Sequence, residues 1–438
     1  KDVYFSTNIA DEASSTKLNW NALTLDGTAF SAVTGLAAVG AVDDSLGVVF
    51  DNTLGFSFGG AFRGEIDSTI LLAGALTGDI VALEQLDALP GDVAASETVN
   101  VVSFTVANGY LFAGVGGSFT TVDGVVTDIA AGGTGFAAAN LSLDFLSISQ
   151  GQTDPTIVGT TQTWTAIKAG AGQLDIRGID GIDLKAYDLE IRLNAAATTD
   201  LAATATKLDW TTLSATDAPI FGTSSITDAQ DGINADLDYS VSGAIEVAIE
   251  DNVLLFGAFG LNAQTKTIDD GNGITIADAS VLSFSISGAT MFAGAGGALI
   301  YDGTTQRATG LEDGGTGLAV QNANFELAII SEPATATAPL SWLAVAGEIG
   351  KADLRGIDGV TAIARNVTFR FNGAATDAAM VSTKLDWSAI SDFDGTRIGT
   401  IDATLDLSFG GEIELNIQDN VLVAATRPPR TVIWRMAL

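Results

Sequence analysis

The chain has 438 residues and a formal net charge of −34 at pH 7, with 19 Lys and Arg residues against 53 Asp and Glu residues. It contains neither Cys nor His, which excludes disulfides, zinc sites of the Cys/His type, cysteine nucleophiles and Ser-His-Asp triads. The shortage of Lys and Arg disfavours nucleic acids and anionic membrane surfaces as partners, because both need basic patches.

The composition provides ample material for a core, since 47% of the residues are hydrophobic and the mean hydropathy is +0.34. These residues come in short runs, none of which reaches the roughly 18 to 20 apolar residues of a membrane helix. The 50 Gly and only 7 Pro are typical of many tight turns between short strands. The acidic side chains predict a solvated surface, or alternatively a surface that binds calcium in places.

The stretch Thr-Lys-Leu-Asx-Trp occurs three times, at 16–20, 206–210 and 383–387, with spacings of 190 and 177 residues (210−20 and 387−210). Each copy follows an alternating strand pattern that ends in Asn, at Asn8, Asn194 and Asn372. Further matches between the copies keep the same register along the chain, which predicts a tandem repeat of about 180 residues.

We therefore predict five segments. They are the end of a preceding repeat (1–8), repeat 1 (9–194), repeat 2 (195–372), the start of repeat 3 (373–426) and an atypical tail (427–438). The first residues show no signal peptide, and the chain is expected to be an interior fragment of a longer protein. The tail has three Arg, two Pro and no acid. It is interpreted as sequence outside the repeat register, or alternatively as a terminal cap.

Strand patterns dominate in chain order. Alternating apolar and polar residues at 101–106, 281–286 and 405–417 predict strands, and Asp-Gly and Asn-Gly pairs predict the turns. One helix is predicted over 79–89, ending before Pro90. The Lys207-Leu208-Asp209-Trp210 stretch is interpreted as a core strand with Leu and Trp inside, or alternatively as an exposed Trp platform for a sugar.

Two all-β architectures fit these patterns. Short strands joined by small corner residues, as at 137–145 and 318–329, predict an elongated β-solenoid or β-rod built from the repeats. A string of antiparallel β-sandwich domains is the alternative, because a strand and a turn every 8 to 12 residues suits both.

The order of motifs resembles the repeats of giant, acidic, Cys-free proteins of bacterial surfaces and secretions, grouped with the haemolysin-type (RTX-like) adhesins. The residues that carry this resemblance are Phe112-Ala-Gly-Val-Gly-Gly, Gly132-Gly-Thr-Gly-Phe, Arg177-Gly-Ile-Asp-Gly and their second copies at 292–297, 314–318 and 355–359. The resemblance implies a role in adhesion, matrix or filament formation. The calcium nonapeptide of that group is absent, since the Gly-Gly-Thr-Gly stretches lack its Asp.

The loop Asp269-Asp270-Gly271-Asn272-Gly273 is the candidate calcium site, with Asp269, Asp270 and Asn272 as ligands; a plain acidic turn is the alternative. Arg177 with Asp180, and Arg355 with Asp358, are expected to form a repeated ion pair. No pair of acids has a spacing that singles it out for glycoside hydrolysis, so we predict a protein that is not an enzyme.

The sequence thus predicts a structural protein outside a bacterial cell or on its surface. It would be a segment of an adhesin stalk or a subunit of an extracellular filament or surface layer. The alternative is a calcium- or carbohydrate-binding module of a surface adhesin. The predicted partners are further copies or adjacent repeats, through open β edges, and surface glycans. Nucleic-acid binding and membrane insertion are not expected.

Overall fold

The structure, a computed structural model, describes residues 4–8, 17, 24–25, 28–29, 54–66, 69–83, 86, 99–151, 161–199, 205–217, 219–250, 252–336, 338–376, 381–393, 395–418 and 421–432. The chain forms two compact units. Unit 1 comprises residues 1–172 and 190–237, and unit 2 comprises residues 173–189 and 238–438. The described residues are all-β, as the sequence predicts, and contain no α-helix.

The long strands that lie wholly or mostly in unit 1 pair in an open antiparallel sheet in the order β1-β4-β5-β6-β9-β10-β11; residues 173–177 of β10 and 182–189 of β11 belong to unit 2. Their bounds are β1 (Tyr4–Thr7), β4 (Leu54–Ile66), β5 (Ile70–Leu83), β6 (Val99–Val115), β9 (Thr134–Gly151), β10 (Thr161–Arg177) and β11 (Ile182–Thr198). Two small hairpins accompany them, β2 (Thr24–Leu25) with β3 (Thr28–Ala29) and β7 (Phe119–Val122) with β8 (Val125–Ile129).

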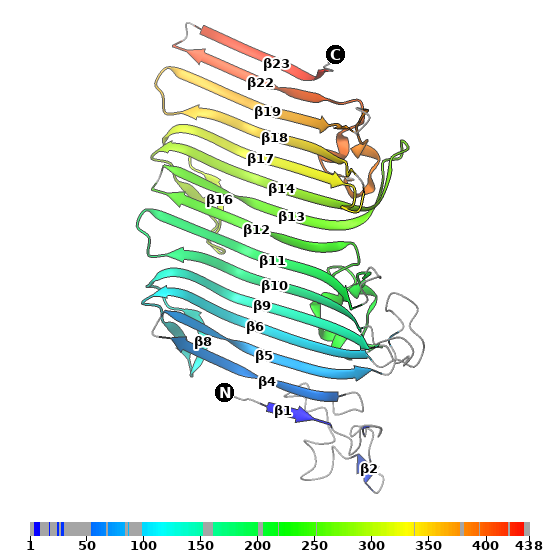
Figure 1. Cartoon of the computed structure of the whole chain (residues 1–438). Helices are drawn as coiled ribbons and strands as arrows, with labels where there is room; N and C mark the ends of the chain where they lie inside the picture. The colour runs from blue at the N-terminus through cyan, green and yellow to red at the C-terminus, as the bar shows by residue number, and fades with distance from the viewer. Residues whose placement is uncertain are drawn as a thin grey trace. The chain divides into compact units, whose positions relative to one another are not determined.

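Unit 2 contains a sheet of the same kind, in the order β12-β13-β14-β17-β18-β19-β22-β23 (Figure 1). The bounds are β12 (Leu237–Ile249), β13 (Val253–Asp269), β14 (Thr275–Ala295), β17 (Thr316–Ser331), β18 (Ser341–Arg355), β19 (Val360–Gly373), β22 (Leu407–Ile417) and β23 (Val421–Val432). Its small hairpins are β15 (Leu299–Tyr301) with β16 (Ala308–Leu311) and β20 (Ala375–Thr376) with β21 (Ser382–Thr383).

Each unit also carries a segment of short 3-10 helices after a long strand. The unit 1 cap (205–237) holds η3 (Trp210–Thr212), η4 (Pro219–Thr223) and η5 (Ser225–Thr227). The unit 2 cap (381–405) holds η6 (Trp387–Ala389), η7 (Ser391–Phe393) and η8 (Ile398–Thr400). Asp209 and Asp386 begin the first turn of each cap, where their carboxylates accept the N–H of Thr211 and Ser388.

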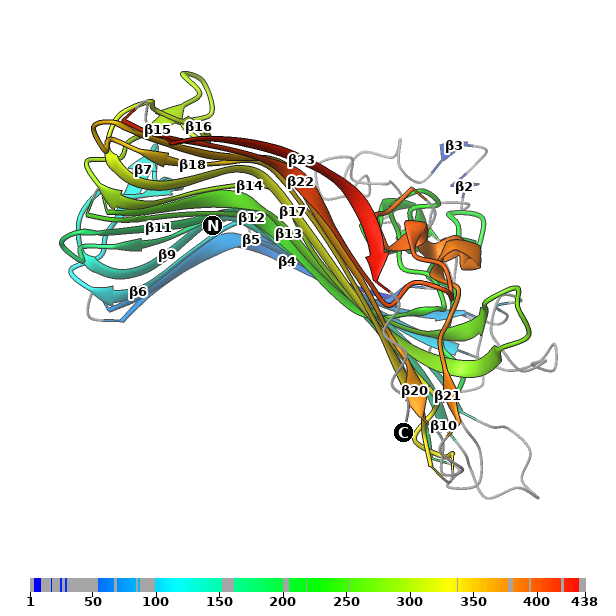
Figure 2. The same ribbon diagram turned by 90° about the horizontal axis from the view of Figure 1, so that it is seen from above.

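The core of unit 2 lies on one face of the sheet, here named the covered face. Trp342, Ala344 and Ala346 of β18 pack under the cap near one end of the strands. Phe292 and Ala319 pack under the β15–β16 hairpin near the other end (Figure 2). Residues with positive φ at mid-strand, such as Asn322 and Asn366, shift the alternation so that both clusters share this face.

The opposite face of the unit 2 sheet, here named the apolar face, has no second layer of described residues over it. Register and alternation place sixteen apolar side chains together there: Phe259, Leu261, Leu282, Phe284, Ile286, Phe325, Leu327, Ile329, Leu343, Val345, Ile349, Val367, Phe369, Phe371, Leu407 and Phe409. The rings of Phe284 on β14, Phe325 on β17 and Phe369 on β19 form a row, with 6.3 Å between consecutive centroids; β18 lies between β17 and β19 and places Gly347 opposite both Phe325 and Phe369. Phe371 and Phe409 remain 38% and 56% exposed.

Three local predictions are wrong. The helix expected over 79–89 is strand through Leu83, because Val81 and Leu83 are buried and β5 pairs with β6 along its whole length. Residues 84–85 and 87–89 lie outside the described residues. The Lys-Leu-Asp-Trp stretch is not a strand, since a 3-10 turn begins at Trp210 and at Trp387. The ion pairs join Arg177 to Asp175 and Arg355 to Asp353, two residues back along one strand.

The predicted repeat boundaries remain predictions. The tail predicted over 427–438 begins inside β23, which runs to Val432 and pairs with β22. Two Pro residues occur in this strand, at 428 and 429, in keeping with the tolerance of edge strands for Pro. The rest of the tail lies outside the described residues.

Candidate functional site

A buried Asn joins the sheet to the cap in each unit. In unit 1, Asn194 in the last part of β11 donates from Nδ2 to the carbonyls of Leu208 and Asn234, at 2.9 and 2.7 Å. Its Oδ1 accepts the indole Nε1–H of Trp210 at 3.0 Å. Asn194 is 4% exposed, and these bonds use its whole side-chain amide.

Unit 2 repeats this network with new residues. Asn372 donates to the carbonyls of Leu385 and Asp402, both at 3.0 Å, and accepts Nε1–H of Trp387 at 3.0 Å. A second buried indole also recurs, because Trp342 donates to the carbonyl of Thr383 as Trp164 does to that of Thr206. The recurring sequence stretch therefore encodes the docking of a cap.

The four Trp residues of these networks are no more than 2% exposed. The predicted core placement of Trp210 is confirmed, and the alternative of an exposed Trp platform for a sugar is wrong there; Trp164, Trp342 and Trp387 are buried in the same way. Lys207 and Lys384 do not point freely outward either, since each donates to backbone carbonyls beside the strand that follows the cap. Trp20, in the first copy of the stretch, lies outside the described residues.

A carboxylate from the sheet also holds the last 3-10 turn of each cap. Oε2 of Glu326 accepts the backbone N–H of Arg397 and of Ile398, at 2.7 and 3.0 Å. In unit 1, Oδ2 of Asp144 accepts the backbone N–H of Ser225 at 2.7 Å and the hydroxyl of Ser224 at 2.9 Å. These two acids position the caps, a role that no local sequence pattern around them indicates.

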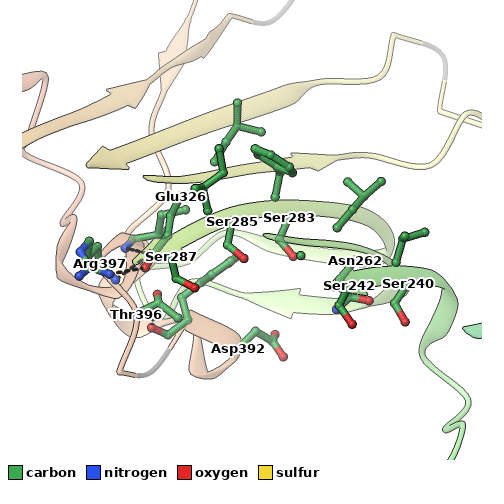
Figure 3. A pocket seen from close by; sticks show the side chains of 18 residues that line it. Ser240, Ser242, Asn262, Ser283, Ser285, Ser287, Glu326, Asp392, Thr396 and Arg397 are labelled. Atoms are coloured by element: carbon green, nitrogen blue, oxygen red, sulfur yellow. Dashed lines mark hydrogen bonds and ion pairs between the residues drawn. The ribbon is translucent and has the colours of Figure 1, made fainter. Parts of the chain in front are cut away.

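The candidate functional site is a groove in unit 2, between the covered face and the cap, with a volume of about 440 Å³ (Figure 3). We name it the serine groove, after the hydroxyls that line its sheet side. Its polar lining consists of Ser240, Ser242, Asn262, Ser283, Ser285, Ser287, Glu326, Asp392, Thr396 and Arg397. Ligand pockets in proteins have volumes of about 300 to 1,000 Å³, so the groove is large enough for a small molecule.

The sheet side of the groove has unused hydrogen-bonding capacity. Within the part of the chain that the structure describes, the five Ser hydroxyls form no hydrogen bond, and Oδ1 of Asn262 is buried without a partner. The register sets Asn262 opposite Ser283 and Gly260 opposite Ser285 on neighbouring strands. A Cβ at Gly260 would lie 3.1 Å from Oγ of Ser285, so the glycine leaves room in front of that hydroxyl.

The charges at the rim of the groove are paired. Asp392 forms an ion pair with Lys266. Arg397 bridges Glu326 at 3.2 Å and Glu348 at 3.1 Å. With two carboxylates on one guanidinium, the rim has no spare positive charge among these groups, so it is unsuited to an anion.

The corresponding part of unit 1 is built differently. Phe112 corresponds to Phe292, an offset of 180 (292−112), which aligns Thr105 with Ser285. The partner of Thr105 in the register is Thr77, at the place that Gly260 occupies in unit 2. The hydroxyls of Thr77 and Thr105 hydrogen-bond to each other, so the unit 1 position is closed by its own side chains.

A second polar cluster lies under the β15–β16 hairpin. Glu246 is 3% exposed, its Oε2 accepts the backbone N–H of Ala308 at 3.1 Å, and Nζ of Lys185 lies 3.8 Å from its Oε1. Burial, reinforced by the nearby charge of Glu246, raises the pKa of Tyr301 to about 12. The cluster holds the hairpin on the sheet, and its acid and base are occupied by that role.

The predicted calcium ligands lie in the turn between β13 and β14. Asp270 is 1% exposed, and its Oδ1 accepts the N–H of Asn272 and of Ile274, both at 2.9 Å. Asp269 accepts the N–H of Gly271, and Nδ2 of Asn272 donates to Asp386. The described residues contain no group of three or more His, Cys, Asp or Glu arranged to hold a metal. Calcium binding there remains a prediction.

No family model, curated protein or solved structure matches this chain. Among the described residues, no helix has the length and apolar character needed to cross a membrane.

Proposed function

We propose that the chain is a structural repeat protein, a segment of an adhesin stalk or a subunit of an extracellular filament or surface layer. The observation that carries this proposal is the recurrence of one docking network, Asn194 with Trp210 in unit 1 and Asn372 with Trp387 in unit 2. Such networks stabilise an architecture, and their Asn and Trp side chains are engaged in it. Repetition of a structural element is what a stalk or filament requires.

The apolar face of unit 2 supports the self-association that this function requires. The six strands from β13 to β22 have at least 11 residues each. Strands about 4.8 Å apart, with a rise of about 3.3 Å per residue, then give a face of roughly 1,000 Å². The sixteen apolar side chains span at most seven residues on each strand and so cover roughly half of this face, an area at the upper end of the roughly 300 to 600 Å² of the largest, often functional, apolar patch on a typical monomer. A stable interface buries about 800 Å² per partner, so a second copy of this chain can cover the face.

The same proposal covers the arrangement of the strands and the location of the protein. The neighbouring strands of each unit are antiparallel, which favours an elongated β-rod over the stacked coils of a β-solenoid; a string of β-sandwiches is the alternative. The resemblance to RTX-like surface proteins and the charge of −34 support a place outside a bacterial cell or on its surface. A calcium- or carbohydrate-binding module of a surface adhesin is the alternative function.

Electron microscopy and sedimentation of the purified chain over a range of concentrations test this function. We expect ordered filaments or oligomers, and we expect Phe325→Asp to disperse them by placing a charge on the apolar face. Asn324→Asp is the matched control, because it adds the same charge one residue away on the other face and should leave assembly intact.

Monomers at every concentration would contradict the proposal. So would flotation of the chain with neutral phosphatidylcholine vesicles that is lost in Phe325→Asp, because a lipid surface would then be the partner of the apolar face. Circular dichroism of both variants establishes that the sheet has formed.

A further inference from the structure

We propose that the serine groove of unit 2 binds a neutral saccharide, through the hydroxyls of β12 and β14 and the amide of Asn262. This proposal is independent of the scaffold function, because it concerns one groove on the covered face and not the apolar face. The starting observation is the set of polar groups in this groove that have no partner among the described residues.

The arrangement of these groups suits a ligand with several hydroxyls. Ser283, Ser285 and Ser287 alternate along β14, so their hydroxyls lie roughly 6 to 7 Å apart on one face, and the next strand adds Asn262 about 4.8 Å away. A Ser hydroxyl both donates and accepts, and an Asn amide offers both functions on separate atoms. A sugar ring presents the same mixture of donors and acceptors around its edge.

Other ligand classes fit the groove less well. An apolar molecule would bury the hydroxyls without partners, at a cost of about 1 to 3 kcal/mol for each group. An anion would meet Asp392 and Glu326, whose cationic partners are already occupied. A metal ion would find mostly neutral hydroxyls, and the described residues hold no metal-binding group of acids. A neutral saccharide bonds to the hydroxyls through its own hydroxyls and can place the C–H faces of its rings on the apolar side chains that also line the groove, such as Phe393 and Ile398.

Gly260 is the residue that keeps the groove open. Unit 1 has Thr77 at this place, and its hydroxyl pairs with that of Thr105. In unit 2 the absent side chain leaves Ser285 free and lets a ligand approach the backbone of β13. The difference between the units predicts that binding occurs in unit 2 and not at the corresponding position of unit 1.

The test uses saturation-transfer NMR of the whole chain with four neutral oligosaccharides: cellotriose, maltotriose, xylotriose and chitotriose. We expect transfer to at least one of them. Gly260→Thr installs the unit 1 arrangement and should abolish that transfer, while Ser285→Ala should weaken affinity about three- to tenfold, as expected for one hydrogen bond. Thr105→Ala, the matched change in unit 1, should leave binding unchanged.

Absence of transfer to all four sugars in the native chain would overturn the proposal. Undiminished transfer in Gly260→Thr would also overturn it, because the sugar would then bind elsewhere. Gly260 lies within β13 without a positive φ, so a Thr is compatible with its backbone, and an unchanged urea midpoint verifies that the variant folds. The microscopy of assembly is unaffected by any of these results.

Discussion

Replacing Asn372 by Ala tests whether the buried Asn holds the cap to the sheet. The substitution removes three hydrogen bonds at 3.0 Å in a place where the side chain is 2% exposed. It leaves the carbonyls of Leu385 and Asp402 and the indole N–H of Trp387 without their partner. Each orphaned group costs about 1 to 3 kcal/mol, and water entering the vacated space offsets part of this cost. We expect a loss of about 3 to 5 kcal/mol in the free energy of unfolding.

Urea unfolding followed by Trp fluorescence measures the global loss, and exchange of the Trp387 indole proton measures opening of the cap alone. Asn194→Ala should behave in the same way in unit 1, because its network is the same. Asn372→Asp should be equally damaging, since a carboxylate oxygen, which can only accept hydrogen bonds, then faces the carbonyl oxygens of Leu385 and Asp402. Ser382→Ala, an exposed change nearby, should stay within about 0.5 kcal/mol. A loss below about 1 kcal/mol for Asn372→Ala would refute the idea that the network fixes the cap.

Two further predictions concern carboxylates. Burial alone would raise the pKa of Asp353, but the bonds and charges of Arg355 and Lys351 outweigh it, and the pKa lies below its ordinary value. The ion pairs of Asp353 therefore stabilise the fold at pH values above the unfolded-state pKa of this carboxyl, which is about 4. This stabilisation is lost as the pH falls through the pKa of Asp353 in the folded state. The urea midpoint of the native chain should fall on acidification from about pH 5 to pH 2, and that of Asp353→Asn should fall less steeply. Equal falls of the midpoint in the two proteins would contradict this. Calcium titration tests the loop of Asp269, Asp270 and Asn272. If the loop binds calcium, millimolar calcium raises the melting temperature of the native chain and does not raise that of Asp269→Asn. Identical melting temperatures with calcium and with chelator would contradict a calcium site there.

The all-β class and the repeat were predictable because they depend on alternation and identity along the chain. Strands such as β14 and β22 follow directly from period-two patterns. The predicted helix at 79–89 failed because its apolar spacing also suits a strand, and pairing with β6 decides between the two. Sequence alone did not reveal that the two core clusters of unit 2 share one face of the sheet, since mid-strand residues such as Asn322 and Asn366 reverse the alternation within a strand.

The candidate site was less predictable than the fold. The five Ser residues of the serine groove look like ordinary outward positions of β12 and β14, and only the placement of the unit 2 cap makes them a groove. A comparison of the repeats does contain a usable signal. Gly260 occurs where unit 1 has Thr77, and a change from a β-branched residue to Gly inside a strand marks a place where the backbone is left open.

The Asn–Trp pairing also explains why the repeated stretch tolerates variation around a fixed set of residues. The partners are 16 residues apart in unit 1 and 15 apart in unit 2, so the intervening loop can change length while the contact persists. In the first copy Asn8 and Trp20 are 12 residues apart in the sequence (20−8), and Asn8 is 4% exposed. Lys17 also donates to the carbonyl of Leu54, as Lys207 does to that of Leu237. Apart from the bond between Asn and Trp themselves, the shared Asn and Lys side chains thus bond to backbone carbonyls, and such bonds require a defined side chain at one end only.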